Sequence, residues 1–399
     1  MNFRFLPFLL VALTGCKTAQ LPAQTNNPPA PTPAPRVQTP LDRYLQTPQP
    51  LFSWKREKRA DEIEGETNLR LVSQSWQGRA WTHRVQIFTP EIVKFPDAAL
   101  VSVHFGGGSF IEAFLARSLA NATGATVVNL FDVPNQPLYG RSEDDLVAYS
   151  FGQFLKTGDE SWPLLFPMTK AILASLDATQ EWSKTPEAEA RLGAEIERFI
   201  VTGASKRGWA TYFAGAANDS RVVGLVPVVY DNLNIPAQVQ NQKSRWGQTS
   251  EAAAPYDEIG LFDVAADPQK REIVAAIDPY FVRERLSMPK LLINATNDEF
   301  WAHNSSDFYL NDLPGPTRLY FVPNAPHILG AGATGAAGTV AAWSRQILSG
   351  QTPPGISLQT QNDAQNTRFV AKTNAKNLRA VRLWFASAPT KDFREARWS

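Results

Sequence analysis

Ser205 lies at a turn of small residues between a β-rich run and a helical pattern. The run 199–202 leads into Gly203 and Ala204, and an alanine-rich helical pattern follows the serine at once. This strand–turn–helix junction is the geometry of a nucleophile elbow, in which a strained turn exposes a serine hydroxyl above a sheet. We therefore interpret Ser205 as a candidate nucleophile for attack on a carbonyl carbon.

The residues after this serine depart from the usual G-x-S-x-G pattern. Arg207 is the second residue after Ser205, and the glycine comes one place later, at Gly208. A bare Gly-x-Ser is also common, and a serine before a helical pattern can simply cap the helix N-terminus. The order of strand, turn and helix favours the nucleophile over the cap.

A serine hydroxyl needs a base to attack a carbonyl, and histidine is the usual base near neutral pH. The chain has four histidines. His327 follows the last predicted strand in a proline-rich loop, which makes it the predicted base, and His303 is the alternative. We expect His83 to be a surface or edge residue and His104 to shape a neighbouring glycine loop.

The third member of a catalytic triad in this arrangement is an acid between the serine and the histidine in chain order. Asp298 fits, because it comes directly after the predicted strand 291–295. Asp231, after the preceding strand, is the alternative acid, and Glu299 is a weaker one. A carboxylate at such a place can also simply cap a turn.

The oxyanion that forms during acyl transfer needs hydrogen-bond donors. The backbone N–H of Lys206 is the expected first donor. Gly106, Gly107 and Gly108 end the strand predicted at 100–105, and their backbone N–H groups are the expected further donors. With His104 before it, this loop resembles the HGGG-type oxyanion loop of esterases. The alternative is a flexible turn without a catalytic role.

Five aromatic residues are candidates for the lining of a substrate pocket, although each is more often a core residue than a binding platform. They are Tyr139, Trp162, Trp209, Trp246 and Trp301.

Short β-rich runs alternate with helical patterns along most of the chain. The predicted strands are 84–88, 100–105, 126–130, 199–202, 222–229, 291–295 and 318–322. The predicted helices are 111–122, 143–155, 164–176, 187–196, 206–216 and 339–348. Alternation of this kind indicates an α/β fold with a mostly parallel sheet covered by helices on both faces, and together with the serine it indicates an α/β-hydrolase-like fold.

Composition indicates a folded protein without a nucleic-acid partner. Hydrophobic residues make up 43% of the chain, and 39 basic residues are balanced by 38 acidic ones. Such a balance gives no electrostatic footprint for nucleic acid. The single cysteine allows no intrachain disulfide and no cysteine-based zinc site, so we expect no metal and no other cofactor.

The N-terminus reads as an export signal. A short apolar run, 5–13, ends in Leu13-Thr14-Gly15-Cys16, which is similar to the bacterial lipobox. The run is too short to span a membrane. We therefore expect lipidation at Cys16 and a cell-envelope location, with Lys17 favouring the outer membrane. The alternative is an ordinary signal peptide that happens to contain a cysteine.

These features divide the chain into four regions. We expect a lipoprotein signal at 1–16, a Pro/Thr-rich linker at 17–45 and a hydrolase domain at 46–350, with a cap or lid at 231–289. The linker is too poor in apolar residues to fold by itself. The region 351–399 is expected to be a small, truncated β-module, with strands at 369–371 and 380–385.

Several motifs, in order along residues 46–399, give a family resemblance. The chain resembles the PhoPQ-activated pathogenicity-related family through Val133-Pro134-Asn135-Gln136-Pro137-Leu138, residues 162–171, residues 203–209, Asp278-Pro279-Tyr280, residues 286–290, Asn297-Asp298-Glu299-Phe300 and Val381-Arg382-Leu383-Trp384. The resemblance implies an α/β-hydrolase-like fold, a periplasmic or surface setting and a C-terminal β-module. It does not imply a defined substrate.

The sequence around Ser205 is also similar to the Gly-Cys-Ser-Arg-x-Gly elbow of glucuronoyl esterases, with Lys206 in place of the arginine. The resemblance implies that the Lys206 side chain stabilises an oxyanion or attracts an acidic substrate. The alternative is a solvated lysine at the start of a helix.

Two functional interpretations remain open at this stage. The first is an exported serine hydrolase of esterase or peptidase type, with a small-molecule, peptide or sugar-ester substrate. The second is a non-catalytic binding lipoprotein that uses the same fold, because a fold does not establish an activity. The region 231–289 contains charges of both signs, so the choice between ester and peptide stays open, as does the oligomeric state.

Overall fold

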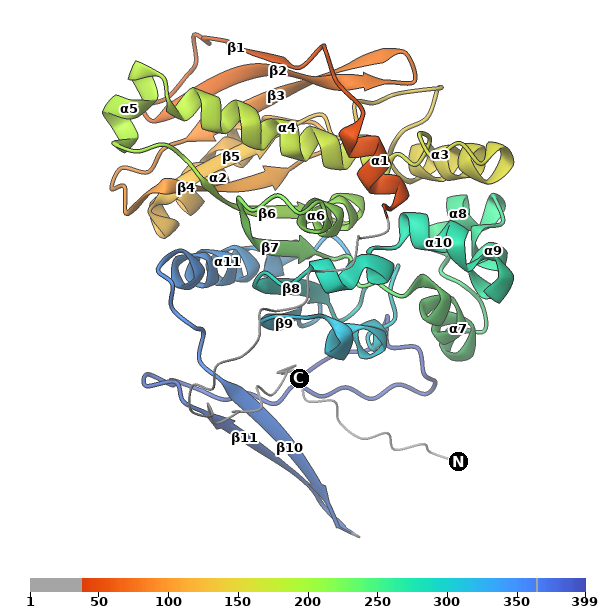
Figure 1. The fold of residues 1–399 in the computed structure, drawn as a ribbon. Helices are drawn as coiled ribbons and strands as arrows, with labels where there is room; N and C mark the ends of the chain where they lie inside the picture. The colour runs from red at the N-terminus through yellow and green to blue at the C-terminus, as the bar shows by residue number, and fades with distance from the viewer. Residues whose placement is uncertain (1–37, 364) are drawn as a thin grey trace, which may run out of the picture.

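The computed structural model describes residues 38–363 and 365–399, and these form a nine-stranded sheet with helices on both faces (Figure 1). The sheet order is β1-β2-β3-β5-β4-β6-β7-β8-β9. The pairs β1–β2, β2–β3 and β3–β5 are antiparallel. The remaining pairs, from β5–β4 to β8–β9, are parallel. The strands are β1 Ser53–Arg56, β2 Glu66–Trp76, β3 Arg79–Phe88, β4 Phe95–Val103, β5 Ala125–Leu130, β6 Arg198–Ala204, β7 Val222–Val228, β8 Lys290–Ala295 and β9 Thr317–Val322.

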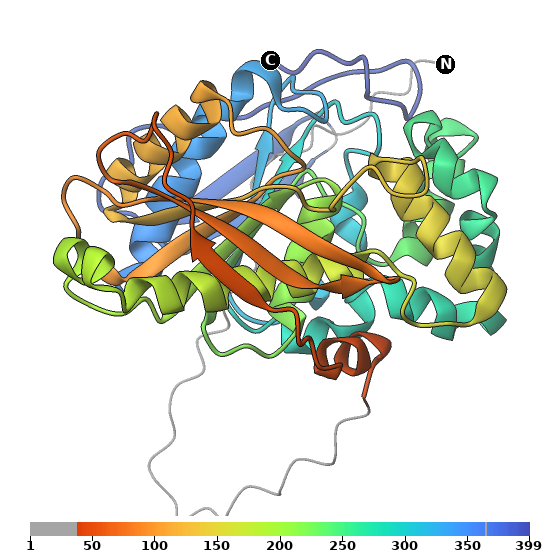
Figure 2. The same cartoon turned by 90° about the horizontal axis from the view of Figure 1, so that it is seen from above.

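Helices cover both faces of the sheet (Figure 2), and the sheet divides the hydrophobic core into two parts. Helices α4 and α6 cover one face, with α1 packed on α4, while α2 and α11 cover the other. The bounds are α1 Pro40–Gln46, α2 Phe110–Thr123, α3 Glu143–Thr157, α4 Leu165–Ser183, α5 Pro186–Leu192, α6 Lys206–Ala216 and α11 Ala333–Leu348.

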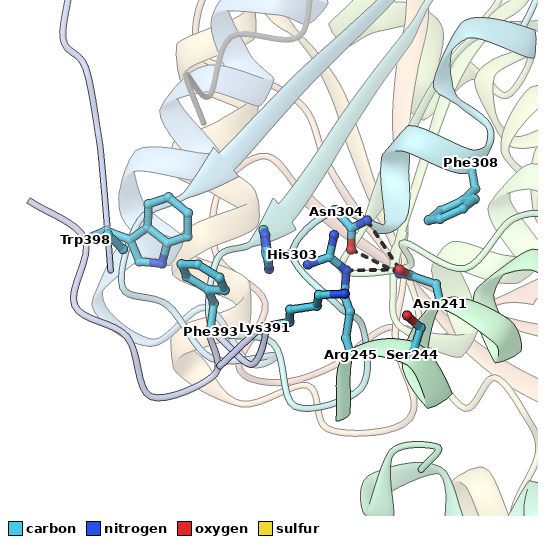
Figure 3. A pocket seen from close by; sticks show the side chains of 10 residues that line it. Asn241, Ser244, Arg245, His303, Asn304, Phe308, Lys391, Phe393 and Trp398 are labelled. Atoms are coloured by element: carbon cyan, nitrogen blue, oxygen red, sulfur yellow. Dashed lines mark hydrogen bonds between the residues drawn. The ribbon is translucent and has the colours of Figure 1, made fainter. Parts of the chain in front are cut away.

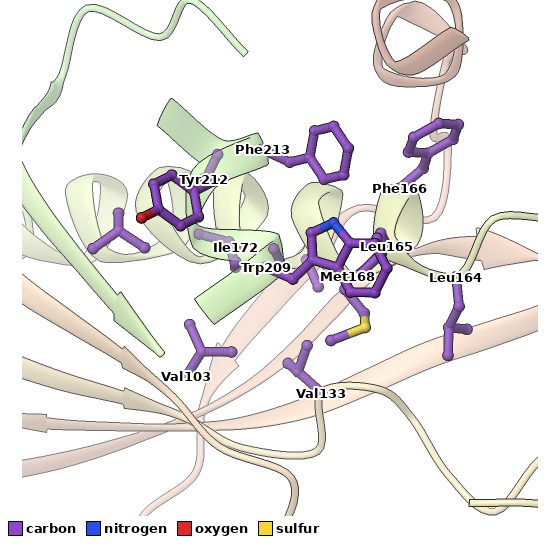
Figure 4. Close-up of a cluster of buried hydrophobic side chains, with 14 of the residues drawn as sticks. Val103, Val133, Leu164, Leu165, Phe166, Met168, Ile172, Trp209, Tyr212 and Phe213 are labelled. Atoms are coloured by element: carbon purple, nitrogen blue, oxygen red, sulfur yellow. The ribbon is translucent and has the colours of Figure 1, made fainter. Parts of the chain in front are cut away.

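The larger part of the core lies where α4 and α6 pack against the sheet. Figure 4 shows side chains from α4 and α6 meeting Val103, at the end of β4, and Val133. All of them are almost completely buried. This packing fixes α6, and therefore the start of the helix beside Ser205, against the central strands.

A helical cap follows β7 and lies beside the carboxyl ends of the strands (Figure 1). It consists of α7 Ile235–Trp246, α8 Ala254–Glu258, α9 Leu261–Ala266 and α10 Arg271–Ile277, with short 3₁₀ turns between them. Trp209 joins the cap to α6, because its Nε1 donates a hydrogen bond to the carbonyl oxygen of Ile277 at 2.7 Å.

The predicted strands and helices of the central domain are present, with longer ends in several cases. Strands β1 and β2 precede the first predicted strand and were not predicted. The helix predicted at 187–196 ends at Leu192, because Gly193 adopts the left-handed conformation that closes a helix. The predicted linker also extended too far: α1 lies inside it, and its Leu41 is buried against the core.

The C-terminal region contains one β-hairpin, β10 Ile356–Asn362 paired with β11 Thr367–Thr373. The strand predicted at 380–385 is wrong, because that segment has no regular structure and is joined to another described segment only by the two backbone hydrogen bonds between Phe385 and Ser399. The chain then returns to the main domain. There the side-chain amide of Asn297 donates to the carbonyl oxygens of Phe393, Arg394 and Ala396.

The predicted lipidation site, Cys16, and the signal region lie outside the described residues. Within residues 38–363 and 365–399, no helix is long and apolar enough to cross a membrane. In the same residues, no group of three or more His, Cys, Asp or Glu side chains is arranged to hold a metal ion.

Candidate active site

Ser205 lies at the junction of β6 and α6 in a backbone conformation that few residues adopt, with φ 56° and ψ −125°. The surrounding hydrogen bonds hold it there. Its N–H donates to the carbonyl oxygen of Val228 on β7 at 2.8 Å, and its carbonyl oxygen accepts from Trp209 at 3.0 Å. A strained backbone of this kind persists only where its neighbours over-determine it, and here it exposes the hydroxyl at the end of the strand.

The two glycines of this junction allow strand and helix to approach closely. A Cβ on Gly203 would lie 2.7 Å from the carbonyl oxygen of Arg207, and a Cβ on Gly208 would lie 3.0 Å from the carbonyl oxygen of Gly203. Gly208 therefore faces the strand that precedes the turn. This contact explains why the sequence needs a glycine three residues after the serine.

His327 links Ser205 to Asp298 through both of its ring nitrogens. Its Nε2 lies 2.9 Å from the Ser205 hydroxyl oxygen, and its Nδ1 lies 2.8 Å and 3.0 Å from the two oxygens of Asp298. Asp298 follows β8 and His327 follows β9, so neighbouring strands deliver them to one edge of the sheet. This is the arrangement in which an imidazole can take a proton from a serine while a carboxylate holds its other nitrogen.

Asp298 and His327 are held in place by further hydrogen bonds. The Phe300 N–H donates to Asp298 at 2.8 Å, and the His327 N–H donates to Glu299 at 3.0 Å. Burial raises the pKa of Asp298 above its ordinary value, while the hydrogen bond from His327 opposes that rise. Glu299 thus contacts the backbone of His327 and not its ring.

The alternative acid, Asp231, does not contact His327. It is buried and accepts a hydrogen bond from the Tyr309 hydroxyl at 2.5 Å. Burial raises the pKa of Asp231 to about 8, so this carboxyl is largely protonated at neutral pH. The geometry therefore favours Asp298 over Asp231 as the partner of the histidine.

The three other histidines lie away from Ser205. His303 lies against the C-terminal segment, with its ring centroid 4.4 Å from that of Phe393. His104 lies beside Phe131 at the base of the glycine loop. The expectation for His83 is wrong: it lies inside β3, fully buried, with Ser73 on one ring nitrogen, and burial lowers its pKa to about 4.

Arg207, the residue that departs from the usual pattern, is buried, and its guanidinium is held by several hydrogen bonds. Its guanidinium donates to both oxygens of Glu143, at 2.5 Å and 2.9 Å, and its Nε donates to the carbonyl oxygen of Val133 at 2.7 Å. The ring of Phe105 lies 5.4 Å from the same guanidinium. Arg207 therefore joins α6 to the start of α3 and to the loops after β4 and β5.

The Lys206 side chain is neutralised by two carboxylates. Its Nζ lies 2.8 Å from Glu143 and 3.0 Å from Asp144, and the side chain is 6% exposed. The role that the elbow resemblance implied for this ammonium, attraction of an acidic substrate, therefore lacks a free charge. The backbone N–H of Lys206 remains at the first turn of α6, directly after Ser205.

The glycine loop lies next to the elbow, because Val103 of β4 pairs with Gly203 of β6 in the sheet. Not all of its N–H groups are available, since that of Gly108 donates to the carboxylate of Glu112 at 2.6 Å. The positions Gly106 and Gly107 remain candidates for oxyanion donors. Gly108, in contrast, is committed to the first turn of α2.

A pocket of about 30 Å³ opens beside Ser205, and its walls are mainly aromatic. Of the five predicted lining residues, Trp209 and Trp301 contribute to it. Sequence reasoning missed the other main wall residues, because they come from the end of β7, the cap and the loop after β8. These are Tyr230, Asn232, Tyr256, Leu261, Phe262 and Phe300.

The remaining three predicted pocket residues lie elsewhere. Tyr139 and Trp162 pack with Trp76 and Tyr149 in a separate aromatic cluster. Trp246 is stacked under the guanidinium of Arg394, which lies 4.3 Å from its ring.

The sheet, the elbow and the order of the three side chains along the chain define the α/β-hydrolase class, and comparison with solved structures agrees for the fold. Acetyl xylan esterase 1 from Thermoanaerobacterium sp. JW/SL YS485 matches with a TM-score of 0.52 and 15% identity, covering 76% of this chain and 92% of the esterase. Acetyl xylan esterase from Paenibacillus sp. R4 matches with a TM-score of 0.50 and 16% identity, covering 79% and 96%.

Sequence comparison then places the chain more narrowly. The PhoPQ-activated pathogenicity-related protein family matches residues 41–394, and the chain belongs to this family. A relative, autocrine proliferation repressor protein A from Dictyostelium discoideum, is 34% identical over 316 residues, which is 73% of this chain. The matched part spans 61% of that relative's length.

The Glu143 pairing predicts a pH-dependent contribution to stability. The Arg207 and Lys206 cations overcome the effect of burial and lower the pKa of Glu143 from 4.5 to about 2. A carboxyl whose folded-state pKa is depressed stabilises the fold above its unfolded pKa and loses that effect as the pH falls through the folded value. Glu143→Gln should therefore destabilise the protein most near pH 7, and the deficit should shrink from about pH 4.5 towards pH 2.

Urea denaturation of both proteins at a series of pH values measures this difference. Glu91→Gln is the matched control, because Glu91 pairs with Arg117 at an exposed site where its side chain is 67% exposed. An equal effect of the two substitutions at every pH would contradict the role given to Glu143.

Proposed function

We propose that this protein is a serine hydrolase of esterase type, with Ser205 as nucleophile, His327 as general base and Asp298 as the residue that orients the imidazole. The observation that carries the proposal is the unbroken chain of hydrogen bonds from the Ser205 hydroxyl through His327 to Asp298. Membership of the α/β-hydrolase class supports it.

In the proposed reaction, the Ser205 oxygen attacks the substrate carbonyl as its proton passes to Nε2 of His327. Asp298 accepts the hydrogen bond from Nδ1 and stabilises the imidazolium that forms. The tetrahedral intermediate collapses to an acyl-enzyme when His327 returns the proton to the leaving alcohol. Water, deprotonated by His327, then attacks the acyl carbon and releases the acid and free Ser205.

The negative oxygen of the tetrahedral intermediate needs donors that point to it before the reaction begins. We assign the Lys206 N–H as the first donor, because it starts α6 immediately after the nucleophile. Gly106 and Gly107 supply the second, since their loop follows the strand paired with β6.

The pocket beside Ser205 favours a short acyl group over a peptide. Its volume is about 30 Å³ and its walls are aromatic and aliphatic residues of the central domain and the cap. Asp144, the carboxylate at this pocket, is paired with Lys206 at 3.0 Å and accepts from the Tyr256 hydroxyl at 2.7 Å. It is therefore not free to hold the amino group of a peptide.

We further propose that the protein is exported and attached to the bacterial envelope through lipid on Cys16. The support is the apolar run 5–13 and the lipobox-like Leu13-Thr14-Gly15-Cys16. Growth of a bacterial host with labelled palmitate should label the wild-type protein and not Cys16→Ser. Equal labelling of the two would remove this part of the proposal.

Reaction with a fluorophosphonate probe tests the proposed nucleophile. An activated serine should form a stable phosphonyl adduct, and tryptic mass spectrometry should find it on the peptide that contains Ser205. Ser205→Ala should not react. Failure of the folded, full-length wild type to react would instead favour the non-catalytic binding interpretation.

Asp298→Asn and Asp231→Asn separate the two candidate acids. Both changes keep the size of a buried side chain, but only Asp298 contacts His327. Asp298→Asn should lower kcat for p-nitrophenyl acetate by about 10⁴-fold, since the amide favours the wrong imidazole tautomer. Asp231→Asn should cause a much smaller loss, and the reverse order would overturn the assignment of the acid.

A further inference from the structure

A second cavity, of about 300 Å³, lies where the cap meets the loop after β8 and the C-terminal segment (Figure 3). This is the lower end of the volume range of ligand pockets, about 300–1,000 Å³. It shares no lining residue with the pocket beside Ser205. Its lining includes two cations, two amides and three Phe or Trp rings, namely Arg245, Lys391, Asn241, Asn304, Phe308, Phe393 and Trp398.

Arg245 brings a charge into this cavity and has no ion-pair contact with the described residues. Its Nε donates to the side-chain oxygen of Asn241 at 3.0 Å, and among the described residues its guanidinium forms no ion pair within 4.0 Å. Burial lowers the pKa of Arg245, with the charge of Asp307 acting against this. A partly buried cation without a paired anion is costly, and a bound anion would remove that cost.

The other titratable groups of the wall leave the cavity positive. Lys391 is exposed and, in the described part of the chain, has no ion pair. Burial and the nearby Arg245 lower the pKa of His303 to about 4, so its ring is neutral at pH 7. No carboxylate is among the residues that line the cavity. The charges of Asp307 and Asp392 act on Arg245 and His303 from outside this lining.

The wall opposite Arg245 is aromatic. Figure 3 shows Phe393 and Trp398 on one side and Arg245 with Asn304 on the other. The two rings have centroids 6.0 Å apart, and Trp398 is only 3% exposed. The Nε1 of Trp398 is buried and has no hydrogen-bond partner among the described residues.

We propose that this cavity binds an acidic sugar unit, a pyranose that carries a carboxylate. Arg245 and Lys391 pair with the carboxylate, and the guanidinium can hold both of its oxygens. The aromatic rings pack against the apolar face of the sugar ring. Asn241 and Asn304 bond to each other in both directions, at 3.0 Å and 3.3 Å. The second N–H of the Asn241 amide and the second lone pair of the Asn304 Oδ1 are left to bond hydroxyl groups of the sugar.

This site does not depend on the proposed reaction, although one loop joins the two. Asp298 and Trp301 lie on the side of Ser205, while His303 and Asn304 line the second cavity. Asn297 binds the C-terminal segment that carries Phe393. Occupation of the second cavity would therefore hold an acidic glycan beside the candidate active site without taking part in the chemistry.

Isothermal titration of the full-length protein with glucuronate tests the proposal, with glucose as the uncharged comparison and inorganic phosphate as an anion without a ring. Glucuronate should bind, glucose and phosphate much more weakly. Arg245→Gln should weaken binding by about tenfold or more, as expected for a lost charge-assisted hydrogen bond. Lys243→Gln is the matched control, because it removes the same charge from an exposed position of α7.

Circular dichroism shows whether Arg245→Gln folds. If it does not, Lys391→Gln serves as a second variant, because Lys391 lines the same cavity at an exposed position. Ser205→Ala should bind glucuronate as the wild type does, because Ser205 does not line this cavity. The binding measurement therefore tests this proposal independently of the proposed hydrolase activity. Equal binding of glucose, binding of phosphate alone, or wild-type affinity in both Arg245→Gln and Lys391→Gln would overturn it.

Discussion

The close contact between β6 and α6 is the constraint on which the rest of the site depends. Gly203 lets the two backbones approach to a distance at which a Cβ would not fit, and Gly208 faces the same contact at a distance that would be tight for a Cβ. Ser205 between them adopts a positive φ. Such a backbone costs of order 1–3 kcal/mol. The buried packing of α4 and α6 against the sheet (Figure 4) offsets this cost, so the core fixes the position of Ser205.

Parallel strands then bring the other two side chains to the same edge. β8 and β9 end with Asp298 and His327 in the loops that follow them, and the ladder between the strands sets the distance between the loops. Hydrogen bonds hold both loops in place. Glu299 accepts a hydrogen bond from the backbone of His327 in the other loop, and Phe300 donates to Asp298 within its own loop. Asn297 anchors the C-terminal segment to the same turn.

Arg207 shows how a variant elbow can be built without loss of that packing. In this chain the glycine that faces the strand is Gly208, and the position before it is free to carry a long side chain. Its guanidinium is paired with Glu143 and bound to Val133. The departure from the common motif is therefore compensated by a partly buried ion pair that ties α3 to the base of the candidate active site.

The sequence allowed most of the parallel sheet to be predicted, because its strands are continuous apolar runs between helical patterns. The order of Ser205, Asp298 and His327 along the chain was also readable, and the three side chains lie within hydrogen-bonding distance, although their catalytic role stays a prediction. Contacts between distant segments were not readable: no local pattern pairs Glu143 with Arg207, 64 residues away. The pocket walls from the cap were missed for the same reason, and Trp246 was misplaced because nothing in the sequence joins it to Arg394.

The central claim is that Ser205 forms a covalent acyl-enzyme, and its most direct test is to trap that species. Wild-type protein mixed with p-nitrophenyl acetate and quenched in acid within the first turnover should carry an acetyl group on the peptide that contains Ser205. Hydrolysis of the ester with no acetyl group on Ser205, or an equal yield of acetylated peptide from Ser205→Ala, would contradict the account.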